Sequence, residues 1–328
     1  MAKTQRTVRR VITRPTDQVN TMIFRDAEKV RDAITAHQKR EIAALYEKWA
    51  DEIGHQADLA ALGETFSDLV KEGQLRDLQR KLEATSVQVM LEVERKIKAN
   101  MFTVASATVM SNNRWLQKLG LIPAGERAIS MAFSNVPDQV IRRLVTGQVY
   151  EGGWNLSKSI WGDNRKTMQS IYEIIAAGKA QNKSIYEISK QLEQYVRPSA
   201  RKPWNLRNAQ GRLIYPKQVD YNAQRLARTL LQHSYQQSVI EMTKANPFVK
   251  GIKWVSNGSR VCELCLSRNG NIYTPEDIPQ DHPNGMCVFP LVTESATEIG
   301  SRWGRWAVSD EGDYPEMDAF ARRLGVWH

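Results

Sequence analysis

Two long stretches of helical apolar periodicity, uninterrupted by proline, constrain the fold of this chain more than any other feature. No proline occurs between Pro15 and Pro123, so nothing in that interval forces a helix to break. Apolar residues recur at three- and four-residue steps, the period of one helix face. The first stripe comprises Ile23, Ala27, Val30, Ile34, Ile42, Leu45, Trp49 and Ile53, and the second Leu75, Leu78, Leu82, Val89, Val93, Ile97, Met101 and Val104. We expect long N-terminal helices, the second of about forty residues.

The first helix is predicted to begin at Pro15-Thr16-Asp17, because proline and short polar residues are typical of a helix start. A long apolar stripe suits either a coiled coil with a second chain or a helical bundle within one chain. We favour the bundle. The segments 126–145, 163–177 and 217–245 are also predicted helices, and Ser184-Ile-Tyr-Glu187 is a capping-box start for another that ends by Pro198.

Strand signals are confined to the C-terminal part of the chain. Residues 250–256 alternate polar and apolar side chains, and 271–274 could pair with them as a hairpin. The fold class expected is therefore α+β, mainly α-helical, with long N-terminal helices and a small C-terminal β hairpin. No apolar run approaches the length of a membrane span. Three cysteines in 328 residues form no disulfide framework, which favours a reducing compartment.

Positive charge is concentrated in two segments. The chain has 46 Lys and Arg against 36 Asp and Glu, a net charge of +10, which favours an acidic partner. Residues 1–16 and 194–219 contain no acid and together hold eleven positive charges. Each segment is either a solvated charge run or a phosphate contact. The candidate contacts to nucleic acid or to an acidic protein are Arg6, Arg9, Arg10, Arg14, Arg201, Lys202 and Arg207.

All three cysteines lie within 26 positions, with one of the five histidines between them. Cys262, Cys265, His282 and Cys287 follow the pattern C-x2-C-x16-H-x4-C, in which two close pairs of donors suit tetrahedral Zn²⁺. Four protein ligands leave no open position, so the predicted zinc site is structural rather than catalytic. The alternatives are a packed set of thiols and a Cys262–Cys265 disulfide across a tight turn.

The same stretch admits an enzymatic alternative. HNH-type nucleases also carry a cysteine pair before an Asp-His dipeptide, here Asp281-His282. They need a further Asn or His downstream to hold the metal and the scissile phosphate. No Asn or His occurs from Gly285 to Trp327. We therefore predict no catalytic residue and keep the nuclease, and a zinc-containing nucleic-acid-binding protein, as alternatives.

Residues 222–290 resemble the signature region of the phage Mu F-like minor head proteins, the phage head-morphogenesis family. The resemblance rests on the helix Ala223-Gln-Arg-Leu-Ala-Arg-Thr-Leu230, the turn Arg260-Val-Cys262-Glu-Leu-Cys265, the turn Asn269-Gly270 and the loop His282-Pro-Asn-Gly-Met-Cys287. Two positions depart from the family pattern. Leu230 stands where the family usually has Glu, and Gly285 where it usually has a further Cys.

The resemblance implies a virion protein of a tailed phage, present in few copies at the portal vertex or inside the capsid, and in the host cytoplasm during assembly. It implies portal and capsid proteins as partners, more than one copy per virion, contact with packaged DNA and no membrane. The implied role is to assist head assembly, genome packaging or DNA ejection. The expected regions are a basic arm 1–16, a long-helix region 17–120, a Mu F-like domain 121–295 and an aromatic tail 296–328. Trp303, Trp306, Tyr314 and Trp327 in that tail suit either a protein interface or packing on the tail's own domain.

Overall fold

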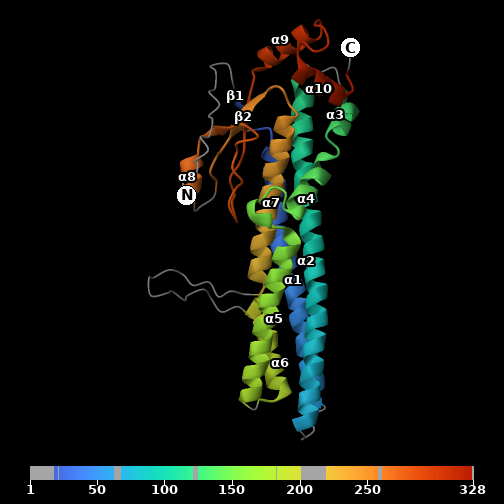
Figure 1. Ribbon diagram of the computed structural model, residues 1–328, viewed down its shortest axis with the longest axis vertical. Helices are drawn as coiled ribbons and strands as arrows, with labels where there is room; N and C mark the ends of the chain where they lie inside the picture. The colour runs from blue at the N-terminus through green and yellow to red at the C-terminus, as the bar shows by residue number, and fades with distance from the viewer. Residues whose placement is uncertain are drawn as a thin grey trace. The chain divides into compact units, whose positions relative to one another are not determined.

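The computed structural model describes residues 18–20, 22–62, 68–120, 125–181, 183–200, 219–257 and 261–326. These residues are mainly helical and include a small antiparallel sheet (Figure 1). They divide into two compact units. The first draws on 1–34, 99–144 and 229–328, and the second on 35–98 and 145–228. Each unit is therefore assembled from separate stretches of sequence.

The two apolar stripes form the long helices α1 (Arg25–Leu62) and α2 (Asp68–Leu119). All eight apolar residues of the second stripe are buried, as expected for helices of a bundle. Of the first stripe, Ile23, Ala27, Ile42, Trp49 and Ile53 are buried, whereas the other three are only partly covered. Helix α2 has 52 residues and so extends beyond the predicted forty.

The predicted helix start at Pro15-Thr16-Asp17 lies outside the described residues, and the residues that follow it form a strand rather than a helix. Strand β1 (Gln18–Asn20) pairs antiparallel with β4 (Leu291–Thr293), and α1 begins only at Arg25. The strand conformation of residues 18–20 depends on a partner strand some 270 positions away in the sequence. Local capping signals carry no information about such a partner.

The second unit contains the hairpin of α5 (Leu156–Ala180) and α6 (Ile185–Val196), which lie side by side in Figure 1. The predicted capping box is present, since Ser184 Oγ accepts from the N–H of Glu187 and the Glu187 carboxylate accepts from the N–H of Ser184. The two helices approach closely at Gly178, where an added Cβ would lie 2.5 Å from Ile188. The short 3₁₀ helices Glu151–Gly153 and Pro198–Ala200 precede α5 and follow α6.

The sheet belongs to the first unit and has the strand order β1-β4-β2-β3, with every pair antiparallel. Strand β2 (Val249–Lys253) pairs with β3 (Ile272–Tyr273), so the predicted hairpin is confirmed. The sequence did not indicate β1 or β4, which are three residues long. Helix α7 (Val219–Lys244) supplies its C-terminal half to this unit, next to the strands (Figure 1).

The remaining helices of the first unit include α3 (Glu126–Ala132) and α4 (Val136–Thr146), which occupy one predicted helix, and two helices in the aromatic tail. Helices α9 (Ala296–Trp306) and α10 (Pro315–Leu324) bury Trp303 and Trp306. Trp303 packs against Phe248 with ring centroids 6.2 Å apart, and the Trp306 indole N–H donates to Asp318 at 2.8 Å. Of the two expectations for the tail, packing on its own unit therefore holds for these two tryptophans.

Candidate metal centre

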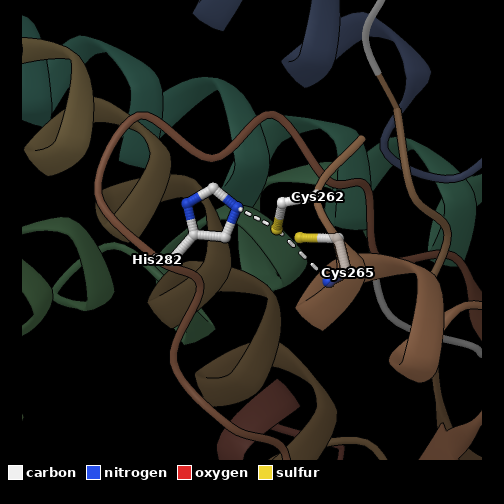
Figure 2. Close-up of side chains that lie close together, drawn as sticks. All are labelled: Cys262, Cys265 and His282. Atoms are coloured by element: carbon white, nitrogen blue, oxygen red, sulfur yellow. Dashed lines mark hydrogen bonds between the residues drawn. The ribbon is translucent and has the colours of Figure 1, made fainter. Parts of the chain in front are cut away.

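Helix α8 (Glu263–Arg268) places two of the three cysteines. Cys262 is its N-cap residue, and its sulfur accepts a hydrogen bond from the backbone N–H of Cys265 at 3.5 Å. Because an N-cap side chain turns back toward the first turn of its helix, the two thiols lie at the same end of α8. Figure 2 shows both sulfurs on this side. The sequence predicted a plain turn here, since a helix of six residues is too short to show periodicity.

The loop 279–287, which leads from β3 to β4, supplies the other two donors. His282 points toward Cys262 in Figure 2, with 3.3 Å between Nε2 and Sγ. The sulfurs of Cys287 and Cys265 are 3.4 Å apart. Cys265 and Cys287 are buried, whereas Cys262 is exposed and His282 is partly exposed. The structure thus brings all four predicted ligands together, with the centre open to solvent on the side of Cys262.

Cys265 belongs to two overlapping groups of candidate ligands. The donor atoms of Cys262, Cys265 and His282 lie within 4.8 Å of one another, and those of Cys265, Asp281 and Cys287 also do. Soft thiolates and an imidazole are the donors that Zn²⁺ prefers in structural sites. The side chains present therefore fit a metal ion, and this cluster could hold one.

The imidazole of His282 is oriented by its own backbone. Its Nδ1 lies 2.9 Å from the carbonyl oxygen of Pro283. A carbonyl can only accept, so this contact requires the hydrogen on Nδ1 and leaves the lone pair of the neutral ring on Nε2. Nε2 is the atom that faces Cys262. A second hydrogen bond that fixes the tautomer in this way is typical of metal-bound histidine.

Asp281 is a member of the site that the sequence analysis did not name as a ligand. Its carboxylate is buried, accepts from Gln232 Nε2 at 2.8 Å and accepts from the backbone N–H of His282 at 2.8 Å. The available signal was the Asp-His dipeptide, which was interpreted only as a nuclease feature. An acidic residue next to a ligand histidine is also a candidate ligand or orienting group.

Helix α7 holds the loop 279–287 through a row of polar side chains. Thr229 Oγ1 accepts from the N–H of Asn284 at 3.1 Å, and His233 Nε2 donates to the carbonyl of Asp281 at 2.9 Å. Gln236 accepts from the N–H of Asp281 and donates to the carbonyl of Pro279. Because these groups are buried or partly buried, each hydrogen bond replaces one to water that the loop would otherwise need. Helix α7 therefore supports the ligand loop, and a bound ion would add a second attachment.

Gln232 joins this row to a buried arginine. Its amide nitrogen donates to Asp281 and to the carbonyl of Cys287, and its amide oxygen accepts from Arg31 at 2.9 Å. Arg31 is 2% exposed and lies over the ring of Tyr235. A neutral amide thus connects a buried carboxylate with a buried guanidinium, which keeps both groups hydrogen-bonded in a dry environment.

The three thiols have different pKa shifts. The backbone N–H of Cys265 lowers the pKa of Cys262. Burial raises the pKa of Cys265, and burial and the charge of Asp281 raise that of Cys287. Hydrogen bonds from Cys265 and from the backbone of Asn257 lower the pKa of Cys287 in part, and the nearby indole N–H of Trp254 lowers it further. Both buried thiols thus have raised pKa values, and a bound metal ion would supply positive charge that stabilises their thiolates.

Comparison with known proteins gives no relative for this chain. No family model, no curated protein and no solved structure matches it. The resemblance to the Mu F-like minor head proteins therefore stays a prediction.

The candidate basic contacts Arg6, Arg9, Arg10, Arg14, Arg201, Lys202 and Arg207 lie outside the described residues. Arg197, at the edge of the second basic segment, is described and makes ion pairs with Glu47, Asp51 and Glu193 at 2.7–3.1 Å. This cation therefore stabilises the second unit. Within the described ranges, no helix combines the length and the apolar character that a membrane span requires.

Proposed function

We propose that this chain is a non-enzymatic structural protein whose first unit is fastened by a zinc ion on Cys262, Cys265, His282 and Cys287. The observation that carries the proposal is that two donors at α8 lie against two donors from the loop 279–287. Cys262 Sγ is 3.3 Å from His282 Nε2, and Cys265 Sγ is 3.4 Å from Cys287 Sγ. Four protein ligands complete a tetrahedral shell and leave no position for a substrate. Zinc supplies positive charge and directional bonds to the thiolates, and its role here is mechanical.

A metal link has a clear purpose in this unit. The strands β2 and β3 share only two paired positions, and such short hairpins are marginal without further support. Cys262 and Cys265 follow β2, whereas His282 and Cys287 follow β3. An ion held by all four closes the hairpin across its end. Asp281 orients this loop, since its carboxylate holds the N–H of His282.

Hydrogen exchange on the full chain tests this role. Cys265→Ser removes the donor shared by both ligand groups, and we expect β2, β3 and the loop 279–287 to lose protection. Helices α5 and α6, which belong to the second unit, keep theirs. Ser267→Ala, on the exposed side of the same helix α8, is the matched control. Unchanged protection in Cys265→Ser would contradict the proposal.

We further propose that this structural protein is a minor head protein of a tailed phage, associated with the portal vertex. The family resemblance supports this assignment, and one contact connects its separate parts. Thr229, from the Arg-Thr pair of the helix motif, accepts the hydrogen bond of Asn284 in the His-Pro-Asn loop. Two motifs that are 55 positions apart in the sequence are thus in direct contact.

Mass spectrometry of virions from the phage whose genome encodes the chain tests the assignment. We expect the protein in purified particles, in few copies relative to the major capsid protein, and cross-linked to the portal. Its absence from particles would contradict the assignment. DNA-binding assays separate the alternatives, because a head protein should bind duplex weakly with a steep salt dependence. Sequence-selective binding would instead favour a regulator, and cleavage that is lost in His282→Ala would favour a nuclease.

A further inference from the structure

Trp254 lies beside Cys287 on the same face of the sheet. Val255 and Val288 form an antiparallel bridge, with N···O distances of 3.0 and 2.9 Å in the two directions. Trp254 is therefore opposite Phe289, and their rings are 5.1 Å apart in an edge-to-face contact. Cys287 is two residues from Phe289. Its side chain hence points to the same face as Trp254, at the diagonal position that long side chains reach.

The indole N–H of Trp254 is a buried donor without a conventional acceptor. The side chain is fully buried, and Nε1 makes no hydrogen bond within ordinary distance and angle limits to any described residue. Leaving such a donor unpaired destabilises a folded protein. The nearby acceptor is Cys287 Sγ, which also accepts a hydrogen bond from the backbone N–H of Asn257. A thiolate accepts such hydrogen bonds much better than a neutral thiol.

We infer that Trp254 is a positioning residue of the metal centre, whose indole N–H donates to the Cys287 thiolate when an ion is bound. The inference rests on the proposed zinc site. It gives the buried indole N–H of Trp254 an acceptor. It also gives the buried thiolate a hydrogen-bond donor. The ligand class is a thiophilic divalent cation such as Zn²⁺, Co²⁺ or Cd²⁺.

The test is cobalt binding by the full chain, with Trp254→Phe as the variant. Trp49→Phe is the matched control, because Trp49 is also buried with an unpaired Nε1 but belongs to the second unit. We expect Trp254→Phe to bind cobalt about tenfold more weakly in chelator competition and to displace the thiolate-to-cobalt charge-transfer band. Trp49→Phe should change neither. Equal affinity and an unchanged band in Trp254→Phe would overturn the inference.

A second measurement needs no variant and remains available if Trp254→Phe fails to fold. In wild-type protein loaded with cadmium-113, the indole Hε1 of Trp254 should show scalar coupling to the metal across the N–H···S bond. A loaded centre without that coupling would overturn the inference while the proposed zinc site stands. A wild-type protein that binds neither cobalt nor cadmium would instead contradict the zinc site itself.

Discussion

The backbone at Gly285 lies directly against the carboxylate of Asp281. A Cβ atom at position 285 would be 2.2 Å from Asp281 Oδ2 and 2.3 Å from its Cγ. Side-chain carbons do not approach this closely, so only glycine fits while Asp281 keeps its place. Position 285 is also where the head-morphogenesis family usually has a cysteine. In this chain the space for that side chain is filled by a buried carboxylate.

We predict that Gly285→Ala destabilises the first unit by about 1–3 kcal/mol, the usual cost of overpacking. The added methyl group must displace Asp281 from Gln232 and from the N–H of His282, so zinc affinity falls as well. Denaturant unfolding and chelator competition measure the two effects. Gly304→Ala is the control, because Gly304 lies in α9 of the same unit with no atom near the added methyl group. It should stabilise the protein slightly, as alanine favours a helix interior. A neutral Gly285→Ala would show that the approach to Asp281 is looser than described.

Gln232→Leu should cost roughly 2–3 kcal/mol of unfolding free energy, because it removes hydrogen bonds to charged buried groups. Both Asp281 and Arg31 lose a partner in this variant. Gln237→Leu is the matched control on the same helix, since its amide donates to the neutral side chain of Gln280 and, among the described residues, to no charged group. Thermal and urea unfolding should show a larger loss of unfolding free energy in Gln232→Leu than in Gln237→Leu. The reverse order would mean that the link between carboxylate and guanidinium adds little stability.

Acid should destabilise the first unit through His233. Burial lowers the pKa of this histidine to about 4, whereas an unfolded histidine titrates near 6.5. The unfolded chain therefore binds the proton first. The contribution of His233 is fully present above about pH 6.5 and is lost as the pH falls toward 4, by about 3 kcal/mol in all.

Urea titrations between pH 7 and pH 4 measure this slope, with a chelator present so that metal release does not contribute. His233→Gln should flatten the curve, because glutamine does not titrate in this range and its amide can still donate to the Asp281 carbonyl. His55→Gln is the control variant, because His55 is exposed. The same slope in wild type and in His233→Gln would assign the acid sensitivity to other groups.

The sequence alone was sufficient to predict the elements that depend on local residue patterns. The eight residues of the second stripe are all buried, and the capping box at Ser184 forms as predicted. The spacing of the cysteines and His282 was also sufficient to find the four donors, since short turns bring such pairs together in most folds.

Features that depend on distant partners were not predictable. Strand β1 is three residues long and is defined by its pairing with β4. The contact of Gly285 with Asp281 requires the loop to fold back on itself, and Gln232 reaches both Arg31 and Asp281 only after α1, α7 and the loop have assembled. Periodicity and capping report on neighbours along the chain, so they do not indicate such contacts.

The most direct test of the account is the zinc content of the purified full-length protein, measured by elemental analysis beside the Cys265→Ser variant. We predict about one zinc per chain in the wild type, the stoichiometry of a single four-ligand site, and its loss in the variant. A folded wild-type protein without zinc, able to bind none when it is supplied under reducing conditions, would contradict the account. The cysteines and His282 would then be a packed cluster, and the β2–β3 hairpin and its loop would be held by α7 without a metal.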